Sequence, residues 1–110
     1  MNSFTQYPLT DLNAAITACG SEEMAKEIFT MLQTSLSEHE TEITEAFNAK
    51  DLDKLSRAAH KLHGAACYTG TPRLKEAAKA LEIAAKHQSA VEPAYEQLCD
   101  VMKATQTASL

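Results

Sequence analysis

The fold of this chain is decided by the stretch Arg57-Ala58-Ala59-His60-Lys61-Leu62-His63-Gly64-Ala65-Ala66-Cys67. At about 100° per residue, an α-helix through this stretch gathers four apolar residues within roughly 60° of one another: Leu55, Ala59, Leu62 and Ala66. We expect this apolar seam to be the buried side of the helix. His60 lies about 120° from the middle of the seam, so it should meet water.

Gly64 needs a reason to be there, because glycine inside a helix costs about 1 kcal/mol relative to alanine. One interpretation is that it removes side-chain bulk one turn from His60, so that the backbone of another macromolecule can approach closely. The two residues would then form a docking face that carries a nucleophilic or ligating histidine. The alternative is an ordinary solvent-facing histidine beside a tolerated glycine, and these two residues alone do not decide the matter.

Apolar residues recur at helical spacing before this stretch, and no segment has the pattern of a strand. The repeat of Leu9, Leu12, Ile16 and Cys19 predicts a short helix with Thr10 as its N-cap and Gly20 as its stop. A long helix capped by Ser21 should follow and run to about residue 48. The long helix should bury an apolar stripe in which methionines act as core filler: Met24, Ile28, Met31 or Leu32, Leu36, Ile43 and Phe47.

Three more helices follow the same pattern. The third should start after its cap Asp51 and end at Tyr68-Thr69-Gly70; the fourth should cover 72–87 after Thr71-Pro72. Ser89 and Glu92 signal the last helix, which should fray from Thr105 onward. Short connections predict an all-α, antiparallel up-and-down four-helix bundle with a short additional N-terminal helix. We assign 1–8 to a linker or frayed leader, 9–107 to the bundle and 108–110 to a disordered tail.

Composition fits one small helical domain. The 110 residues are 45% hydrophobic but only 5% aromatic, so the core must be built from Ala, Leu, Ile and Met. The chain has neither an apolar run of membrane-spanning length nor the layout of a signal peptide. Three cysteines without a CxxC pair suit a reducing compartment. We therefore expect a cytoplasmic protein without direct membrane contact, or a soluble piece of something larger.

The net charge of −5 hides an asymmetry. The segment from Lys50 to Lys86 holds eight basic and four acidic residues, a balance of +4, whereas the remainder carries −9. Positive charge gathered around His60 in an acidic protein favours an acidic protein partner. Nucleic acid is excluded as a partner, because the overall charge repels phosphate and no aromatic interleaving or binding motif is present.

A charged stripe on the fourth helix bears on His60. Lys75, Lys79, Glu82 and Lys86 fall within about 60° of each other. If this stripe faces the third helix, Glu82 could accept the Nδ1 proton of His60, which fixes the tautomer and leaves the Nε2 lone pair outward. The alternative is a solvated charge stripe held by pairs one turn apart.

The residues Ala59-His60-Lys61-Leu62-His63-Gly64-Ala65-Ala66, followed by Gly70, Leu74 and Leu81-Glu82, resemble the histidine-containing phosphotransfer (HPt) family. Its hallmark is H-x-L-K-G on an exposed helix of a four-helix bundle. The resemblance covers about 9–105, and the stretch from His60 to Lys75 is most similar to the C-terminal HPt module of hybrid sensor histidine kinases of the BarA/GacS type. It implies a bacterial two-component phosphorelay, in the cytoplasm, where the module can belong to a membrane-anchored kinase.

The resemblance implies a role for each matching residue. His60 matches the phosphoacceptor, Gly64 the small residue that admits the partner, and Glu82 a polar position that orients the histidine ring. Electrostatic support would come from His63, Lys61, Lys79 and Lys86, and partner contacts from Arg57, Gly64, Ala65, Cys67 and Ile83.

The implied mechanism is that of a covalent carrier rather than an enzyme, because the chain has no nucleotide-binding loop and no acid cluster placed for Mg²⁺. We expect no cofactor on this chain and a monomer that meets two receiver domains, one of a hybrid sensor kinase and one of a response regulator. The receiver supplies Mg²⁺ and a phospho-aspartate, which neutral His60 attacks in line.

His63 departs from the family pattern, which usually has lysine there. A histidine side chain is only partly protonated at neutral pH, so the positive charge near the phosphoryl group should be weaker and depend on pH.

Three other interpretations compete with the carrier. His60, His63 and Cys67 have metal-ligand spacing, with His87 or His39 as a fourth ligand from another helix, which would suit Zn²⁺ or Cu. Cys67 could be a redox switch. The bundle could also be a passive interaction module. A hydrolase is excluded, because no nucleophile lies in a strand-to-helix elbow.

Overall fold

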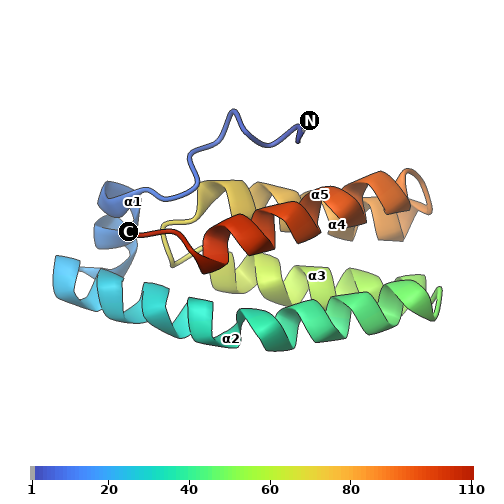
Figure 1. The fold of residues 1–110 in the computed structure, drawn as a ribbon, viewed down its shortest axis with the longest axis horizontal. Coiled ribbons are helices and arrows are strands. Elements are labelled where there is room, and N and C mark those ends of the chain that lie inside the picture. The colour runs from blue at the N-terminus through green and yellow to red at the C-terminus, as the bar shows by residue number, and fades with distance from the viewer. Residues whose placement is uncertain (1) are drawn as a thin grey trace.

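The chain forms five helices and no strand in the part that the computed structural model describes, residues 2–110 (Figure 1). The helices are α1 Leu12–Cys19, α2 Glu22–Asn48, α3 Leu52–Ala66, α4 Pro72–His87 and α5 Val91–Gln106. The expected fold class, an all-α bundle of four long helices with a short one before them, is confirmed. None of these helices combines the length and the apolar character needed to cross a membrane.

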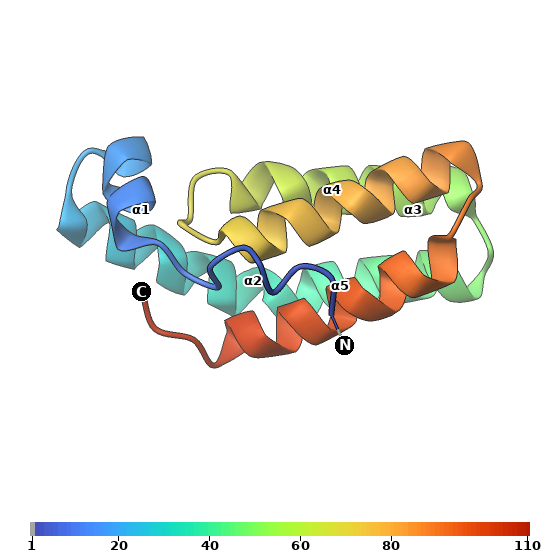
Figure 2. The same ribbon diagram turned by 90° about the horizontal axis from the view of Figure 1, so that it is seen from above.

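The four long helices form a closed ring in chain order. α2 packs against α3, α3 against α4, α4 against α5, and α5 returns to α2. Each connection reverses the direction of the chain, so neighbouring helices are antiparallel (Figures 1 and 2). The molecule measures 40 × 25 × 21 Å. α2 has 27 residues against 15 in α3, and its first turns extend past the bundle, where α1 packs against them.

The apolar seam of α3 is the centre of the core. Leu55, Ala59 and Leu62 are fully buried, and Ala66 is 2% exposed, as the spacing predicts. α4 faces them with its own buried stripe, whose two leucines and two alanines are also those expected: Leu74, Ala78, Leu81 and Ala85. Each fully buried leucine contributes about 1.5–3 kcal/mol relative to an exposed one. Because the seam fixes the rotation of α3, it also fixes which residues point outward.

The predicted core stripe of α2 is wrong at its methionines. Met24 is 44% exposed and Met31 is 64% exposed. The buried residues of α2 repeat in alternating steps of three and four, and they are Ala25, Phe29, Leu32, Leu36, His39, Ile43 and Ala46. The two apolar methionines flank the buried face, whereas the polar residue His39 lies on it, so hydrophobicity alone did not mark that face.

The expected N-caps of α2 and α3 are confirmed, and that of α1 is wrong. Ser21 and Asp51 accept hydrogen bonds from backbone N–H groups in the first turns of α2 and α3, at 3.1 and 3.0 Å. For α1 the cap is Asp11 rather than Thr10, because Asp11 Oδ1 accepts from Ala14 N at 3.0 Å.

The predicted start of α5 at Ser89 is also wrong. Gln88 adopts a left-handed φ of 54°, and Ser89 N donates to Ala84 O at 3.1 Å, so Ser89 belongs to the end of α4. Ala90 precedes α5 without a side-chain cap.

α3 ends at Ala66, earlier than the predicted Tyr68-Thr69-Gly70. Gly70 does have the left-handed φ expected of it, 66°, but its role is to hold α1. Its carbonyl accepts a hydrogen bond from Asp11 N at 2.8 Å. A Cβ at this glycine would lie 2.7 Å from both Ala15 Cβ and Asp11 O.

Both ends of the chain make contacts that the sequence pattern did not predict. In the leader, Asn2 donates to Gln97 O on α5 at 3.0 Å. Thr105 is fully buried and donates from Oγ1 to Val101 O at 2.7 Å, so the expected fraying from Thr105 is wrong. Gln33 on α2 donates to Ala108 O at 2.9 Å, which ties the residues after α5 to the bundle.

Candidate functional site

His60 lies in the middle of α3 on the side turned away from the core. Its side chain is 69% exposed, whereas its neighbours Ala59 and Leu62 are fully buried. The contrast follows from the apolar seam, which leaves position 60 on the outer face of the helix. A mid-helix position has a well-defined backbone, so the exposed imidazole is held on a rigid support.

Glu82 on α4 anchors the His60 ring. His60 Nδ1 lies 3.0 Å from Glu82 Oε2, and Lys86 Nζ donates to the same oxygen at 2.9 Å. Glu82 is only 9% exposed. Its burial raises the pKa of the carboxyl, but the hydrogen bonds from Lys86 and His60 outweigh this and leave the pKa below the ordinary value of 4.5.

The ionised Glu82 determines the tautomer of His60. A carboxylate can only accept hydrogen bonds, so the proton of a neutral His60 ring must be on Nδ1. Nε2 then carries the free lone pair, on a ring that is mostly exposed to solvent. The contact between His60 Nδ1 and Glu82 is the one that the sequence suggested for these two residues.

Gly64 is exposed one turn after His60, and a Cβ placed on it would meet nothing within 4 Å. The packing of this chain therefore gives no reason for glycine at this position. Because glycine inside a helix costs about 1 kcal/mol relative to alanine, the bare position needs an explanation outside the domain.

His63 is half-buried, one turn from His60 on the side toward the core. Its Nε2 is buried and has no hydrogen-bond partner among the described residues. The two imidazole rings are 6.4 Å apart between centroids and tilted by 39°.

The basic residues expected around His60 are not all brought to it. Lys61 turns toward α2 and pairs with Glu42, Nζ to Oε1, at 3.1 Å. Arg57 pairs with Asp53 at 3.1 Å on the surface of α3. Lys86 reaches the site through Glu82.

Lys79 is exposed on α4, one turn before Glu82. Because α3 and α4 are antiparallel and His60 faces Glu82, this register places Lys79 opposite His63 and Gly64.

The remaining predicted contact residues differ in their exposure. Cys67 is exposed, Ile83 is 46% exposed, and Ala65 is half-buried against the core. Among the described residues, the one metal-ligand cluster combines His60 and His63 with Glu82, and Cys67, which the sequence had suggested, is not part of it.

Ser56 was missed by the sequence reasoning. It lies one turn before His60, is 6% exposed and helps to line a shallow surface hollow of about 440 Å³ with Arg57, His60, Glu82 and Lys86. Its position four residues before His60 was the available signal, since such residues share a helix face.

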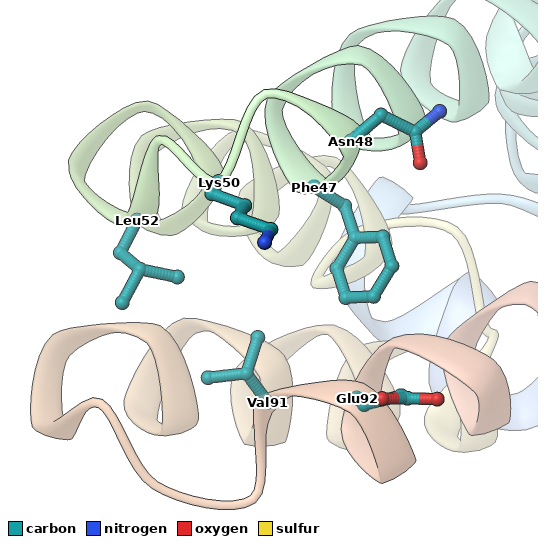
Figure 3. Close-up of a pocket in the computed structure, with 6 residues that line it drawn as sticks. All are labelled: Phe47, Asn48, Lys50, Leu52, Val91 and Glu92. Carbon is teal, nitrogen blue, oxygen red and sulfur yellow. The ribbon is translucent and has the colours of Figure 1, made fainter.

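A larger hollow of about 550 Å³ lies at the end of the bundle where α2 turns into α3 and α4 into α5. Phe47 and Leu52 point toward Val91 across it (Figure 3). Its lining is Phe47, Asn48, Lys50, Leu52, Val91 and Glu92, which does not include His60 or any residue that contacts it. The histidine is thus presented on a helix face and not at the bottom of this hollow.

Comparison with known proteins decides the family. The family model described as Hpt domain matches residues 27–108, which include the whole of α3 and α4 with His60, Gly64 and Glu82. The chain belongs to the Hpt domain family. Members of this family are phosphoryl carriers of two-component phosphorelays, so the resemblance found in the sequence is confirmed.

Two proteins that this Hpt domain is similar to are sensor kinases or parts of them. It is 34% identical over 73 residues to the sensor histidine kinase GacS of Pseudomonas protegens; the match covers 66% of this chain and 8% of the kinase. Its fold matches the crystal structure of the HPT domain of a sensor hybrid histidine kinase from Shewanella with a TM-score of 0.80 and 29% identity. That match covers 90% of this chain and 88% of the other.

Proposed function

We propose that this Hpt domain accepts a phosphoryl group on His60 from the phospho-aspartate of a hybrid kinase's receiver domain, and passes it to the aspartate of a response regulator. The observation that carries the proposal is the exposed His60 ring held at Nδ1 by the ionised Glu82. This contact leaves Nε2 as the nucleophile.

The transfer needs no general base. The Nε2 lone pair of neutral His60 forms a bond to phosphorus while the bond from phosphorus to the aspartyl oxygen breaks, and the aspartate leaves as a carboxylate. Nδ1 keeps its proton throughout, so the phosphorylated ring carries a positive charge. Glu82 stabilises that charge at 3.0 Å, and the same contact weakens when the group leaves for the next receiver.

The chain needs no nucleotide of its own, because the acyl phosphate of the donor is already activated. We place Mg²⁺ with the receiver, where it neutralises phosphoryl charge. On the side of the Hpt domain, Lys79 and Lys86 supply permanent positive charge, and His63 supplies it only when protonated. Lys61 has the smallest share, since Glu42 already holds it on the α2 side.

The docking face follows from what surrounds His60. Gly64 leaves an open position beside it, and the exposed apolar side chain of Ile83 stands on α4. We assign Ala65 and Cys67 to the same contact region and Arg57 to its edge. The concentration of positive charge between Lys50 and Lys86 steers an acidic receiver toward this face.

The chain spans 8% of the length of the curated kinase that it matches, so we propose a role for this one module and not for a whole kinase. We propose that the domain acts as a monomeric carrier module on the cytoplasmic side of a sensor kinase. Its two partners are the receiver domain of that kinase and the receiver of a separate response regulator.

Phosphoryl transfer from a labelled receiver tests the proposal. The purified domain is incubated with a phosphorylated receiver domain and Mg²⁺, and the label on the Hpt domain is treated with acid and with alkali. Phosphohistidine is expected, which is labile in acid and stable in alkali. The label should be absent from His60→Gln.

His87→Gln is the matched control, because His87 is also an exposed histidine but lies at the end of α4. It should be labelled like the wild type. Label that persists in His60→Gln would assign the phosphate to another residue and overturn the proposal.

A further inference from the structure

Three metal-ligating side chains meet at the candidate phosphoacceptor. One ring nitrogen each from His60 and His63 and one carboxylate oxygen of Glu82 lie within 4.8 Å of one another. The two histidines are three residues apart on α3, which puts neighbouring side chains on one helix face, and Glu82 enters from α4. Side chains on facing helices of a bundle form metal sites in this way.

The chemistry of the set suits zinc. Two histidines and one glutamate, with open positions for water, are a ligand set that catalytic Zn²⁺ sites use. Bonds of about 2.0–2.2 Å would bring the three ligand atoms to roughly 3.4 Å from each other. The side chain of His60 is 69% exposed, so a small rotation can close the remaining distance.

His63 is available as a ligand. Its Nε2 is buried without a hydrogen-bond partner among the described residues, although buried polar atoms are normally paired. Nothing therefore holds this nitrogen in a competing hydrogen bond. The lysine that usually stands here in the family is protonated at neutral pH and has no lone pair to offer a metal, so the site is a consequence of the histidine.

Lys86 opposes the metal but does not block it. Its ammonium donates to Glu82 Oε2, yet its side chain is 60% exposed and can turn into solvent when a cation takes its place. Lys79 adds positive charge on the same face. We therefore expect Zn²⁺ to bind with a dissociation constant on the order of 1–50 µM, which is weaker binding than in four-ligand structural sites.

We propose that His60, His63 and Glu82 bind Zn²⁺ and that the bound ion reversibly prevents phosphorylation of His60. The metal site stands on the cluster alone, whereas the block rests on the proposed function. A metal bonded to Nε2 occupies the nucleophilic lone pair directly. A metal bonded to Nδ1, between the ring and Glu82, forces the proton onto Nε2, so the lone pair is lost in either case.

Direct binding tests the site. Zn²⁺ is titrated into the metal-free domain in competition with a chromophoric chelator. The wild type should bind one ion. Loss of an outer-shell partner alone weakens metal affinity by about 10–100-fold, so His63→Ala and His63→Lys should raise the dissociation constant at least about tenfold. Cys67→Ala and His87→Ala should bind like the wild type. No binding below about 100 µM, or equal binding by His63→Ala, would overturn the site.

Transfer measured with and without Zn²⁺ tests the block. Each variant serves as its own reference: Zn²⁺ should slow labelling of the wild type and of His87→Ala at least about tenfold, in line with the loss of a free nucleophile. His63→Lys should lose this inhibition. Any effect of Zn²⁺ on the receiver would act on all variants alike. Inhibition of His63→Lys as strong as that of the wild type, or tight binding without any inhibition of the wild type beyond that of His63→Lys, would refute the block. A domain that takes no label even without Zn²⁺ refutes the proposed function, while the titration still decides the metal site.

Discussion

Replacing Gly64 by alanine should stabilise the domain and at the same time impair its transfer. The added Cβ would meet nothing within 4 Å inside the chain, and Gly64 lies within α3, so no contact or backbone strain opposes the change. Alanine in a helix interior is favoured over glycine by about 0.5–1 kcal/mol. In a domain of this size that corresponds to a rise in Tm of about 2–6 °C.

The loss of function comes from the partner's side. If a receiver packs against the bare helix at this position, the methyl group overpacks the interface, which costs about 1–2 kcal/mol. Transfer from a phosphorylated receiver should then slow by roughly 5–30-fold. Gly64→Gln should slow it further, because its side chain is larger, while α3 remains helical.

Thermal unfolding followed by circular dichroism, and transfer rates measured on the same samples, separate the two effects. Gly70→Ala is the control. The φ of Gly70 is 66°, and a Cβ at this position would lie 2.7 Å from Asp11 O, so the variant should lose about 1–3 kcal/mol of stability. A Gly64→Ala variant that is less stable than the wild type, or that accepts phosphate at the wild-type rate, would contradict a docking role for Gly64.

Three other predictions concern charge and hydrogen bonding. Glu82→Ala should slow phosphorylation of His60 by about 5–10-fold, because it removes a partly exposed charge-assisted hydrogen bond. Glu82→Gln keeps an acceptor and should slow phosphorylation less. The ¹⁵N chemical shifts of the His60 ring report its tautomer in each variant. Burial and the nearby Lys61 lower the pKa of His39 below 6.5, so below about pH 6.5 the unfolded chain binds more protons than the folded one. The free energy of unfolding should therefore fall as the pH drops below about 6.5. Urea unfolding at pH 7.5 and 5.5 measures this fall, which His39→Gln should lose. Lys79→Ala should slow association with a receiver at low salt more than Lys61→Ala, and equal effects would contradict the orientation of Lys61 toward α2.

The sequence alone was sufficient wherever a side chain's place follows from its own helix. The rotation of α3 could be read from the seam of Leu55, Ala59, Leu62 and Ala66, and this placed His60 outside. On α2 the spacing correctly placed Leu32, Leu36 and Ile43 in the core, but it was wrong at Met24 and Met31, which flank the buried face. Only the neighbouring helices select the face that is buried.

Contacts between side chains on two different helices could be suggested from the sequence but not determined. The contact between His60 and Glu82 was expected as one arrangement of α3 and α4, and the structure has it at 3.0 Å. The orientation of Lys61 toward Glu42 was not foreseen, because it depends on the long α2 running beside α3. The gathering of His63 with Glu82 was missed for the same reason: the spacing along one helix suggested Cys67 instead.

The exposure of the His60 side chain, 69%, sets the conditions under which a charged carrier would exist between its encounters. At this exposure, a phosphoryl group on the ring would be open to bulk water between encounters. Protection of the phosphoryl group from water, and the choice of acceptor, would then come from the receiver domain that is bound at the time. The rate and direction of phosphoryl transfer would then be controlled by the receiver domains that bind and not by the Hpt domain itself.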